Sequence, residues 1–481
     1  MTQHIPQAQL WAQFTSTHVK EAGLANSTYP IVPTTALQHL QDRFAIIDLS
    51  GEIRVVDRHQ IADVLSGSHK GEVSFYKKAD AELLMKRALE RLPMASKPSD
   101  VVRDFWVSPN TLQYEATAFS PLTRPPTTLN FWVGPTVQPA PGCWVLLRDY
   151  LRDVICGGNS NAYDYLVQYM AHMIQRPEEK PGVMVVLLGG QGTGKGVYFS
   201  LLRAIWPRTT LQVSDVEQVI GKFNAALERN FVVCMDEALF YGDRRAIDRL
   251  KSTVTEQFIQ IEQKYQPSRS IDSVHRFFAS SNHEHFANVE RDDRRFLFLR
   301  LSATRQQDTT YFSAVTAAIN DPGTLNALAY YLQRKDISGF NVRVKPKTDE
   351  QTTQKLRSLQ GFERFWYEVL TSADLAGDGH RSDTWTADVF VSTSSLLSSY
   401  REFDKNAQRH QTLQEAQVAD TIRRICPSAR KRRETIVSHG FQLQEQRRGF
   451  RFPAIKTARD EFSTYLGCEL DWDEGDGSEP D

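Results

Sequence analysis

The chain has 481 residues, a formal net charge of −1 and a hydrophobic content of 41%. This length predicts roughly two to four folded domains with substantial cores. A net charge near zero argues against a uniformly basic nucleic-acid binder, so any such binding must depend on local patches. No apolar run approaches the ~20 residues that cross a bilayer, and no secretion signal is evident, so we expect a cytoplasmic protein without membrane contacts. The five cysteines stand singly and predict neither disulfides nor a zinc site.

The first 180 residues predict two regions. In residues 1–130, two β-rich runs between Phe44 and Asp57, separated by Ser50 and Gly51, predict a hairpin, and residues 79–92 predict an amphipathic helix. We expect this α+β region to serve assembly or partner binding. In residues 131–180, apolar side chains recur every three or four residues between positions 144 and 174, which predicts a helical collar.

In residues 181–343 the sequence pattern differs, because the predicted strands there are apolar throughout. These runs are residues 183–188, 231–235, 277–280 and 296–299, and helical stretches separate them. Continuous apolar strands that alternate with helices are typical of a parallel sheet covered on both faces. The sequence therefore predicts an α/β fold for this region.

A glycine-rich segment, "GGQGTGKG", follows the first of these strands and precedes a predicted helix. Its glycines let backbone N–H groups converge on phosphate oxygens, while Lys195 reaches the β and γ phosphates. The pattern is that of a P-loop, except that Gly196 replaces the usual Mg²⁺-binding hydroxyl residue. Since Mg²⁺ readily keeps water ligands, we still expect a working site for ATP and Mg²⁺. The predicted nucleotide-binding residues are Gly189, Gly190, Gln191, Gly192, Thr193, Gly194, Lys195, Gly196 and Val197.

Two further polar elements follow predicted strands. Asp236 and Glu237 end the strand at residues 231–235, as expected for a carboxylate that holds Mg²⁺ and a neighbour that orients or deprotonates the attacking water. We assign the metal to Asp236. Asn282 follows the next strand, where ligands bind in sheet folds, and we expect it to position the water or sense the γ phosphate.

Together these motifs resemble those of superfamily 3 helicases, in particular the helicase part of phage and mobile-element primase-helicases. The resemblance covers residues 130 to 300 well and implies an AAA+ ATPase that forms a hexameric ring, binds ATP between subunits and moves 3′ to 5′ on single-stranded DNA. In such a ring a neighbouring subunit delivers a cation to the γ phosphate. We expect Arg294 or Arg295 to be this arginine finger, the alternative being ion pairs with Asp292 or Asp293.

The segment between Glu262 and Phe277 reads as a hairpin before the third strand. In superfamily 3 helicases this hairpin enters the central channel with a lysine and a ring residue near its tip, and Lys264 and Tyr265 stand at that place. A cation beside a stacking ring suits single-stranded DNA. The alternative is a solvent-facing loop.

Beyond a linker at residues 344–356, residues 357–467 predict a winged-helix-like domain that binds duplex DNA near an origin or fork. A helical segment there joins a basic cluster, and we expect two strands around a turn at residues 447–449. The predicted DNA-binding residues are Arg430, Lys431, Arg432, Arg433, Arg447 and Arg448. Residues 468–481 form an acidic tail.

The sequence thus predicts an ATP-dependent DNA helicase for replication of a phage or mobile element in a bacterial host, working as a homo-hexamer. A separate primase or replication protein is a further expected partner, because Asp48 and Asp57 do not form an acidic polymerase site in residues 1–130. Two alternatives stay open. One is an AAA+ switch that binds or melts an origin, and the other is a non-translocating ATPase in phage defence.

Overall fold

The computed structural model describes residues 35–49, 51–66, 73–90, 92, 96–237, 244–264, 268–287, 290–375, 385–406, 415–437 and 444–472. The chain divides into two compact units. Unit 1 comprises residues 1–238, 248–284 and 295–345, and unit 2 comprises residues 239–247, 285–294 and 346–481. In the described parts of the chain, no helix is both long and apolar enough to span a membrane.

Unit 1 begins with a small α+β region, in which the predicted hairpin is confirmed. Strands β1 (Phe44–Leu49) and β2 (Glu52–Asp57) pair antiparallel, and β3 (Gln113–Tyr114) adds to β1 in parallel. Thr35 and Gln38 form a capping box at the start of α2 (Ala36–Arg43), which satisfies backbone N–H groups there. The helices of this region are α2 (Ala36–Arg43), α3 (Arg58–Ser66), α4 (Lys78–Leu89) and α5 (Pro98–Val107), and two short strands, β4 (Ala116–Ala118) and β5 (Thr128–Asn130), follow.

The helical segment that precedes the main sheet contains an irregular turn. Helix α6 (Val145–Asp149) continues into a π-helix (Tyr150–Ile155), and α7 (Ser160–Gln175) follows. Single π-turns inside helices often occur at functional sites. The π-helix here lies next to the glycine-rich loop, as described below.

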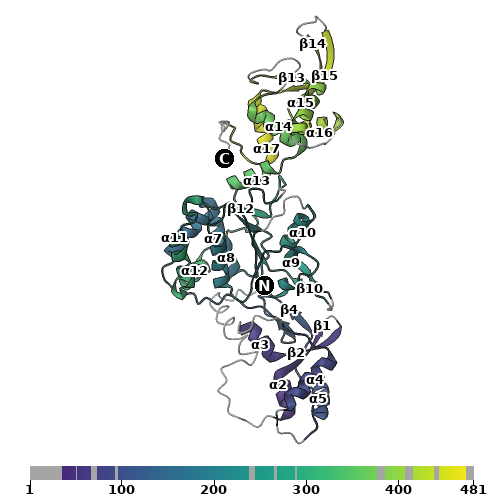
Figure 1. Cartoon of the computed structure of the whole chain (residues 1–481), viewed down its shortest axis with the longest axis vertical. Helices are drawn as coiled ribbons and strands as arrows, with labels where there is room; N and C mark the ends of the chain where they lie inside the picture. The colour runs from purple at the N-terminus through teal and green to yellow at the C-terminus, as the bar shows by residue number, and fades with distance from the viewer. Residues whose placement is uncertain are drawn as a thin grey trace. The chain divides into compact units, whose positions relative to one another are not determined.

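The centre of unit 1 is a five-stranded parallel sheet, which confirms the predicted α/β region. The strand order is β12-β6-β11-β8-β7, from β12 (Phe296–Arg300), β6 (Met184–Leu188), β11 (Arg276–Ser281), β8 (Val232–Met235) and β7 (Thr210–Val213). All residues of β6, β8 and β11 are buried, because helices cover both faces. Figure 1 shows α7, α8 (Lys195–Ile205), α11 (Thr309–Asn320) and α12 (Pro322–Arg334) on one side, and α9 (Glu217–Ile220) and α10 (Arg244–Thr255) on the other.

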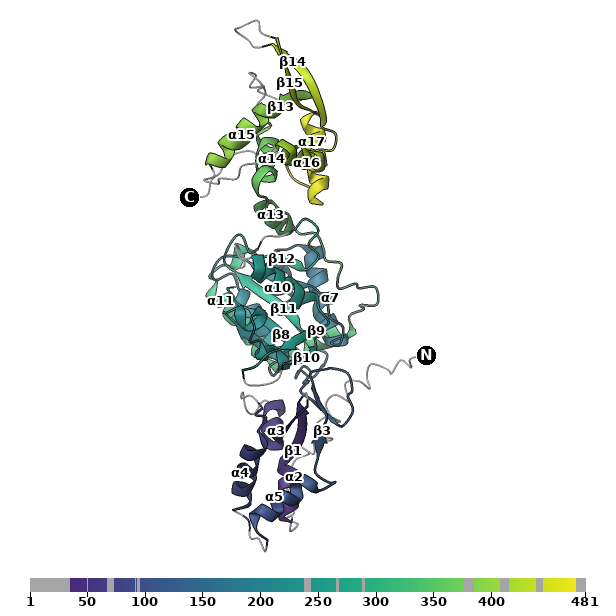
Figure 2. The same ribbon diagram turned by 90° about the vertical axis from the view of Figure 1, so that its right-hand side faces the viewer.

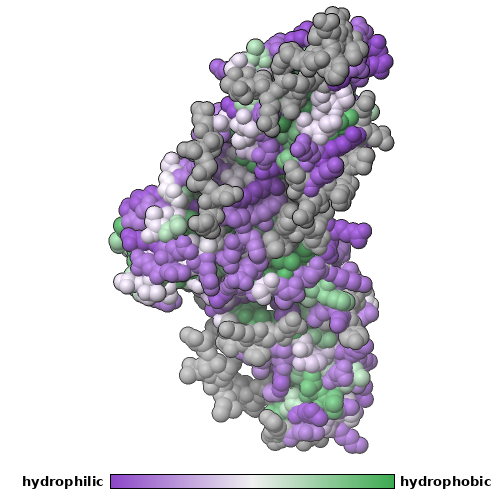
Figure 3. All heavy atoms as spheres, turned by 45° about the horizontal axis from the view of Figure 1, so that its top comes forward, coloured by the Kyte–Doolittle hydropathy of each residue, from purple (hydrophilic) through white to green (hydrophobic). Residues whose placement is uncertain are grey.

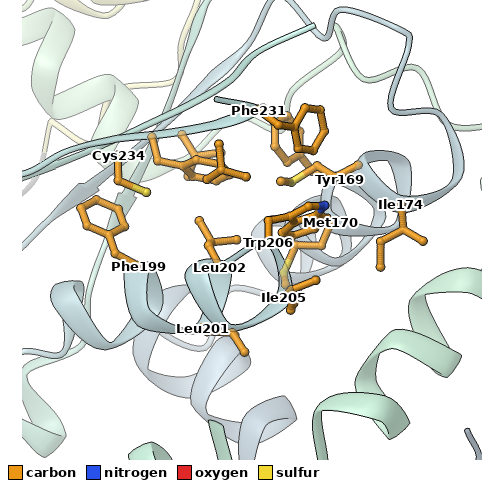
Figure 4. Packing of buried hydrophobic residues seen from close by; sticks show 14 of the residues in the cluster. Tyr169, Met170, Ile174, Phe199, Leu201, Leu202, Ile205, Trp206, Phe231 and Cys234 are labelled. Atoms are coloured by element: carbon orange, nitrogen blue, oxygen red, sulfur yellow. The ribbon is translucent and has the colours of Figure 1, made fainter. Parts of the chain in front are cut away.

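Aromatic and branched side chains fill the space between this sheet and its helices. In Figure 4, Leu202 of α8 and Trp206, which directly follows α8, lie near Tyr169 and Met170 of α7 and near Phe231, which directly precedes β8. All five are buried. This packing fixes α8 against the sheet, and it thereby holds the loop that precedes α8 at the carboxyl end of β6.

A second hairpin in unit 1 confirms the predicted turn before the third strand. Strands β9 (Phe258–Ile261) and β10 (Arg269–Asp272) pair antiparallel, and the chain then enters β11 directly. The hairpin therefore has a short covalent link to the strand that directly precedes Asn282.

Unit 2 carries a three-stranded antiparallel sheet with the order β13-β15-β14. Its strands are β13 (Val389–Ser392), β14 (Arg430–Val437) and β15 (Gln444–Phe452). Its helices are α13 (Asp349–Arg357), α14 (Gly361–Ser372), α15 (Thr393–Asn406), α16 (Glu415–Ile425) and α17 (Ile455–Leu466), of which the last four lie close to one end of the sheet in Figure 2. The winged-helix assignment stays a prediction.

Two expectations about this part of the chain were wrong. The predicted turn at Arg447, Arg448 and Gly449 lies inside strand β15. Gly449 is opposite Ser392, and a Cβ atom on Gly449 would be 2.2 Å from the carbonyl oxygen of Val391, so the glycine permits close approach of β13 rather than a turn. The predicted linker, residues 344–356, largely belongs to α13.

Hydrophilic residues dominate the part of the described surface that Figure 3 shows, and hydrophobic residues form only small patches there. A few large apolar side chains are nevertheless exposed. Among them is Phe223, which is 52% exposed and lies near the β9–β10 hairpin. Isolated exposed apolar residues are common, but one beside basic groups is a candidate contact for a ligand.

Candidate nucleotide and nucleic-acid site

The glycine-rich loop, residues 189–196, connects the buried strand β6 to helix α8. Gly192 and Gly194 adopt left-handed backbone conformations, with φ of +77° and +101°. A Cβ atom on Gly194 would lie 2.5 Å from Cε1 of Phe312, so a larger residue does not fit. The glycines thus permit a tight loop at the N-terminus of a helix, a position that favours bound anions.

Lys195 is the first residue of α8 and is 8% exposed. Its Nζ atom donates to the carbonyl oxygens of Gly189 and Gly190, the latter at 2.7 Å. Burial lowers the pKa of this ammonium group, while the carboxylates of Asp236 and Glu237 act in the opposite direction. The ammonium group of Lys195 therefore bonds to the backbone of the loop and is attracted by the carboxylates of Asp236 and Glu237.

Gly196 stands exposed at the second position of α8, and a Cβ atom there would meet nothing within 4 Å. The absence of a side chain is therefore not imposed by packing. Thr193, the hydroxyl residue of the loop itself, donates to the carbonyl oxygen of Gly190 at 2.9 Å and is buried. It does not take the place of the missing hydroxyl.

The acidic pair follows β8 and is held by groups from two other strands. One carboxylate oxygen of Asp236 accepts from the Ser280 hydroxyl at 2.5 Å, and the other accepts from Nε2 of Gln212 at 3.1 Å. The N–H of Glu237 donates to the same Ser280 oxygen at 3.3 Å. Ser280 is fully buried in β11, so it fixes the backbone and the side chain of this pair.

Glu237 has an unusual backbone, with φ of +53°. Left-handed conformations of residues other than glycine cost free energy and are frequent at functional sites. The conformation brings Oε1 of Glu237 to 3.4 Å from Nδ2 of Asn282. Because β11 lies between β6 and β8, the sheet brings Lys195, the acidic pair and Asn282 to one edge, as the sequence predicted.

Several residues at this edge had not been predicted. Ser280 and Gln212 hold Asp236, and the π-helix contributes the buried hydroxyl of Tyr150, which donates to the carbonyl oxygen of Gly194 at 2.9 Å. After β12, Nε2 of Gln306 donates to the carbonyl oxygen of Gln191 at 3.0 Å. Of these four residues, only Ser280 had a signal in the sequence, because it directly precedes Ser281 and Asn282 in "SSN".

Arg295, one of the two candidate finger arginines, lies away from this edge. Arg295 directly precedes β12, and its carbonyl oxygen accepts from the N–H of Met184 at the start of β6, at 2.8 Å. It therefore stands at the amino ends of the strands, whereas the glycine-rich loop stands at their carboxyl ends. Arg294 precedes it and is exposed. Action on the nucleotide of a neighbouring subunit stays a prediction.

The β9–β10 hairpin places Lys264 in an exposed position, and Tyr265 lies outside the described residues. The Nζ atom of Lys264 is 5.4 Å from the ring centroid of Phe223, and Nζ of Lys222 is 5.9 Å from the same centroid. Asn224 fastens this segment to the hairpin, since its side chain donates to Gln260 at 2.9 Å and accepts from the N–H of Glu262 at 3.0 Å. An exposed ring between two ammonium groups is suited to stack a base beside a phosphate.

The predicted DNA-binding residues of unit 2 lie on two adjacent strands. Arg430, Lys431, Arg432 and Arg433 are on β14, and Arg447 and Arg448 are on β15. Arg447 forms an ion pair with Glu445, with nitrogen–oxygen distances of 2.9 and 3.0 Å. Its charge is therefore partly neutralised.

Over the described parts of the chain, no group of three or more His, Cys, Asp and Glu side chains is arranged to hold a metal ion. A single carboxylate with phosphate and water ligands is, however, a usual arrangement for Mg²⁺. Asp236, which directly follows β8, is the residue that would supply that carboxylate.

The fold and site define a mixed α/β protein with a glycine-rich loop and an acidic pair at one edge of a parallel sheet. Residues 187–295, which include both, match a family of unknown function (DUF5906). In sequence, the chain is similar to a DNA primase-polymerase of Nitratiruptor phage NrS-1, with 26% identity over 146 residues. That match covers 28% of this chain and spans only 20% of the length of the phage protein.

Structural similarity extends over most of the chain. Two apo structures of the C-terminal region of NrS-1 are similar to it, each with a TM-score of 0.57 and 14% sequence identity. Each likeness covers 88% of this chain and all of the compared chain. The chain therefore shares the fold of that C-terminal region.

Proposed function

We propose that this protein is an ATP-dependent DNA helicase that acts in the replication of a phage or mobile element. The convergence of Lys195, the pair Asp236 and Glu237, and Asn282 at one edge of the sheet is the observation that carries the proposal. The similarity to the phage primase-polymerase and to its C-terminal region supports a role in phage replication.

Each residue has a role that fits its position. The glycine-rich loop would hold the phosphates through backbone N–H groups, and Lys195 would leave its present carbonyl partners to bind the β and γ phosphates. Asp236 would hold Mg²⁺, which neutralises charge on the phosphates when it is bound. Glu237 would orient or deprotonate the attacking water, and Asn282, bonded to Glu237, would sense the γ phosphate.

The link from chemistry to DNA would be mechanical. The β9–β10 hairpin continues into β11, and β11 ends at Ser281, directly before Asn282, the residue proposed to sense the γ phosphate. A shift of Asn282 on hydrolysis would therefore move Lys264, which would hold a phosphate of the single strand. A homo-hexameric AAA+ ring with 3′ to 5′ movement, which the resemblance to superfamily 3 helicases implies, belongs to the same proposal.

The test is ATP hydrolysis with Mg²⁺, with and without single-stranded DNA. We expect DNA to raise turnover of the intact protein, Lys195→Ala to abolish hydrolysis, and Lys264→Ala to lose only the stimulation by DNA. Lys97→Ala changes the same charge at another exposed lysine and should behave as the intact protein. Hydrolysis that is unaffected by DNA and by Lys264→Ala would refute the motor.

A mixing experiment tests the arginine finger. Lys195→Ala subunits keep the arginines, and subunits with both Arg294→Ala and Arg295→Ala keep the glycine-rich loop. If the finger acts between subunits, mixing the two inactive proteins restores part of the activity. If it acts within a subunit, or if the arginines serve only as ion-pair partners, mixing restores none.

A second candidate is an ATP-binding switch that does not translocate, such as a protein that melts an origin or an ATPase in phage defence. Two observations favour it: Gly196 offers no hydroxyl to Mg²⁺, and both oxygens of Asp236 already accept protein hydrogen bonds. Binding of ATP without turnover, by the intact protein with DNA and Mg²⁺ present, would decide for the switch.

A further inference from the structure

Strands β14 and β15 of unit 2 form a two-stranded ribbon that is longer than the sheet to which it belongs. They pair along all of β14, from Arg430 opposite Arg451 to Val437 opposite Gln444. The third strand, β13, pairs with β15 only as far as Gly449. Among the described strands, residues 433–437 and 444–448 thus form a ribbon of two strands only, and Figures 1 and 2 show β14 and β15 extending beyond helices α14 to α17.

The register distributes basic side chains over both faces of the ribbon. Opposite residues in an antiparallel pair share a face, and successive residues alternate between faces. Arg433 and its opposite residue Arg448 therefore lie on one face together with Lys431, whereas Arg430 and Arg432 lie on the other. All five side chains are exposed.

Two other arginines of the ribbon are neutralised by carboxylates. Arg451 donates to both oxygens of Glu434, at 2.9 and 2.5 Å, and this contact raises the pKa of its guanidinium group. Arg447 is paired with Glu445, to one carboxylate oxygen of which its Nε and Nη2 atoms both donate. No ion pair within the described residues compensates the other five cations, so each face retains net positive charge.

Cations on both faces require phosphates on both sides. A single strand or a flat surface presents its phosphates to one face of a ribbon, whereas a groove of a duplex has two phosphate walls. The major groove of B-DNA, which is about 12 Å wide, admits a two-stranded β-ribbon. The deep and narrow major groove of A-form RNA does not admit side chains in this way.

We propose that the β14–β15 ribbon enters the major groove of duplex DNA, with Lys431, Arg433 and Arg448 toward one phosphate wall and Arg430 and Arg432 toward the other. This binding needs neither ATP nor a ring, so it is independent of the proposed motor. It also assigns the groove contact to the ribbon rather than to helix α16.

The test compares two double variants of the full chain that remove equal charge. Arg433→Gln with Arg448→Gln removes two unpaired cations of the ribbon, whereas Arg423→Gln with Arg451→Gln removes two that are paired with Asp420 and Glu434. Binding to a short DNA duplex is measured by fluorescence anisotropy over a range of salt concentrations, without nucleotide.

Counterion release predicts a clear difference. Each lost phosphate contact lowers the salt slope by about 0.9, so the first variant should lose about 2 from its slope and on the order of 50-fold in affinity at 0.1 M salt. The control should stay within about threefold of the intact protein. Equal losses in the two variants would overturn the proposal, as would an equal loss of affinity for single-stranded DNA or duplex RNA.

A charge-preserving variant separates binding from folding. Arg433→Lys with Arg448→Lys keeps both charges and should keep the salt slope, because phosphate contact requires charge rather than a guanidinium group. Thermal unfolding of all variants checks that unit 2 is intact. A lysine variant that is folded but binds as weakly as the glutamine variant would contradict contact with the phosphate walls.

Discussion

Replacement of Ser280 by alanine is expected to weaken the response of ATP hydrolysis to Mg²⁺. The hydroxyl donates to Asp236 at 2.5 Å and accepts from the N–H of Glu237 at 3.3 Å. A hydrogen bond to a charged group contributes about 1.5–3 kcal/mol. Loss of groups that orient a metal ligand typically costs about 10–100-fold in metal affinity, which is the same range of free energy. We therefore expect the Mg²⁺ concentration for half-maximal hydrolysis to rise about tenfold or more.

The neighbouring residue provides a matched control for this prediction. Ser281 is equally buried in β11, and its hydroxyl accepts only from the N–H of His283, at 3.1 Å, among the hydrogen bonds described for it. Ser281→Ala should cost similar stability, measured as the thermal unfolding midpoint, and should leave the Mg²⁺ dependence unchanged. The reasoning is wrong if the two variants have the same Mg²⁺ dependence.

Three further predictions follow from the geometry. Gly194→Ala should weaken ATP binding at least tenfold in calorimetry, because φ of Gly194 is +101° and the new Cβ atom would overlap the ring of Phe312. At Gly196, by contrast, a Cβ atom would meet no atom within 4 Å, so Gly196→Ser should fold normally and should lower the Mg²⁺ concentration needed for hydrolysis. Burial lowers the pKa of Lys180 from 10.5 to about 7, so between pH 7 and pH 10.5 the folded state binds fewer protons than the unfolded state. The free energy of unfolding, measured with urea, should therefore rise from pH 7 to pH 9, and it should rise less in the Lys180→Met variant. Phe223→Leu should cost about 1–3 kcal/mol in binding of single-stranded DNA. The control Phe258→Leu, at a ring that is exposed to a similar extent, should cost little, and equal losses would contradict base stacking at Phe223.

The sequence predicted four of the five strands of the main sheet because each of these four is a continuous apolar run, a pattern that depends on burial on both faces. It missed β7, an edge strand in which only Val213 is buried. It did not predict the strand order, since pairing of β6 with β11 and β12 joins residues far apart in the chain. The roles of Ser280 and Gln212 depend on this order, because both reach Asp236 from neighbouring strands. Their residue types alone gave no signal of metal chemistry.

The error at Arg447, Arg448 and Gly449 has a similar origin. Glycine after two polar residues is typical of a turn when only local sequence is considered. Here the glycine sits in mid-strand because the backbone of β13 approaches it, a contact with residues almost sixty positions earlier. The helix at residues 349–357, by contrast, had a local signal that was overlooked, since Thr348 caps it through the N–H of Gln351.

The π-helix of residues 150–155 makes the geometry of the candidate nucleotide site depend on the number of residues in this segment. Its wide turn, in which the N–H of Cys156 reaches the carbonyl oxygen of Leu151, accommodates one residue more than an α-helix of the same height. Deletion of a single residue here would allow a regular α-helix and would rotate Tyr150 by about 100° around the helix axis. Its hydroxyl would then leave the carbonyl of Gly194, so homologous proteins with this contact should keep the same spacing between Tyr150 and helix α7, whatever the side chains in between.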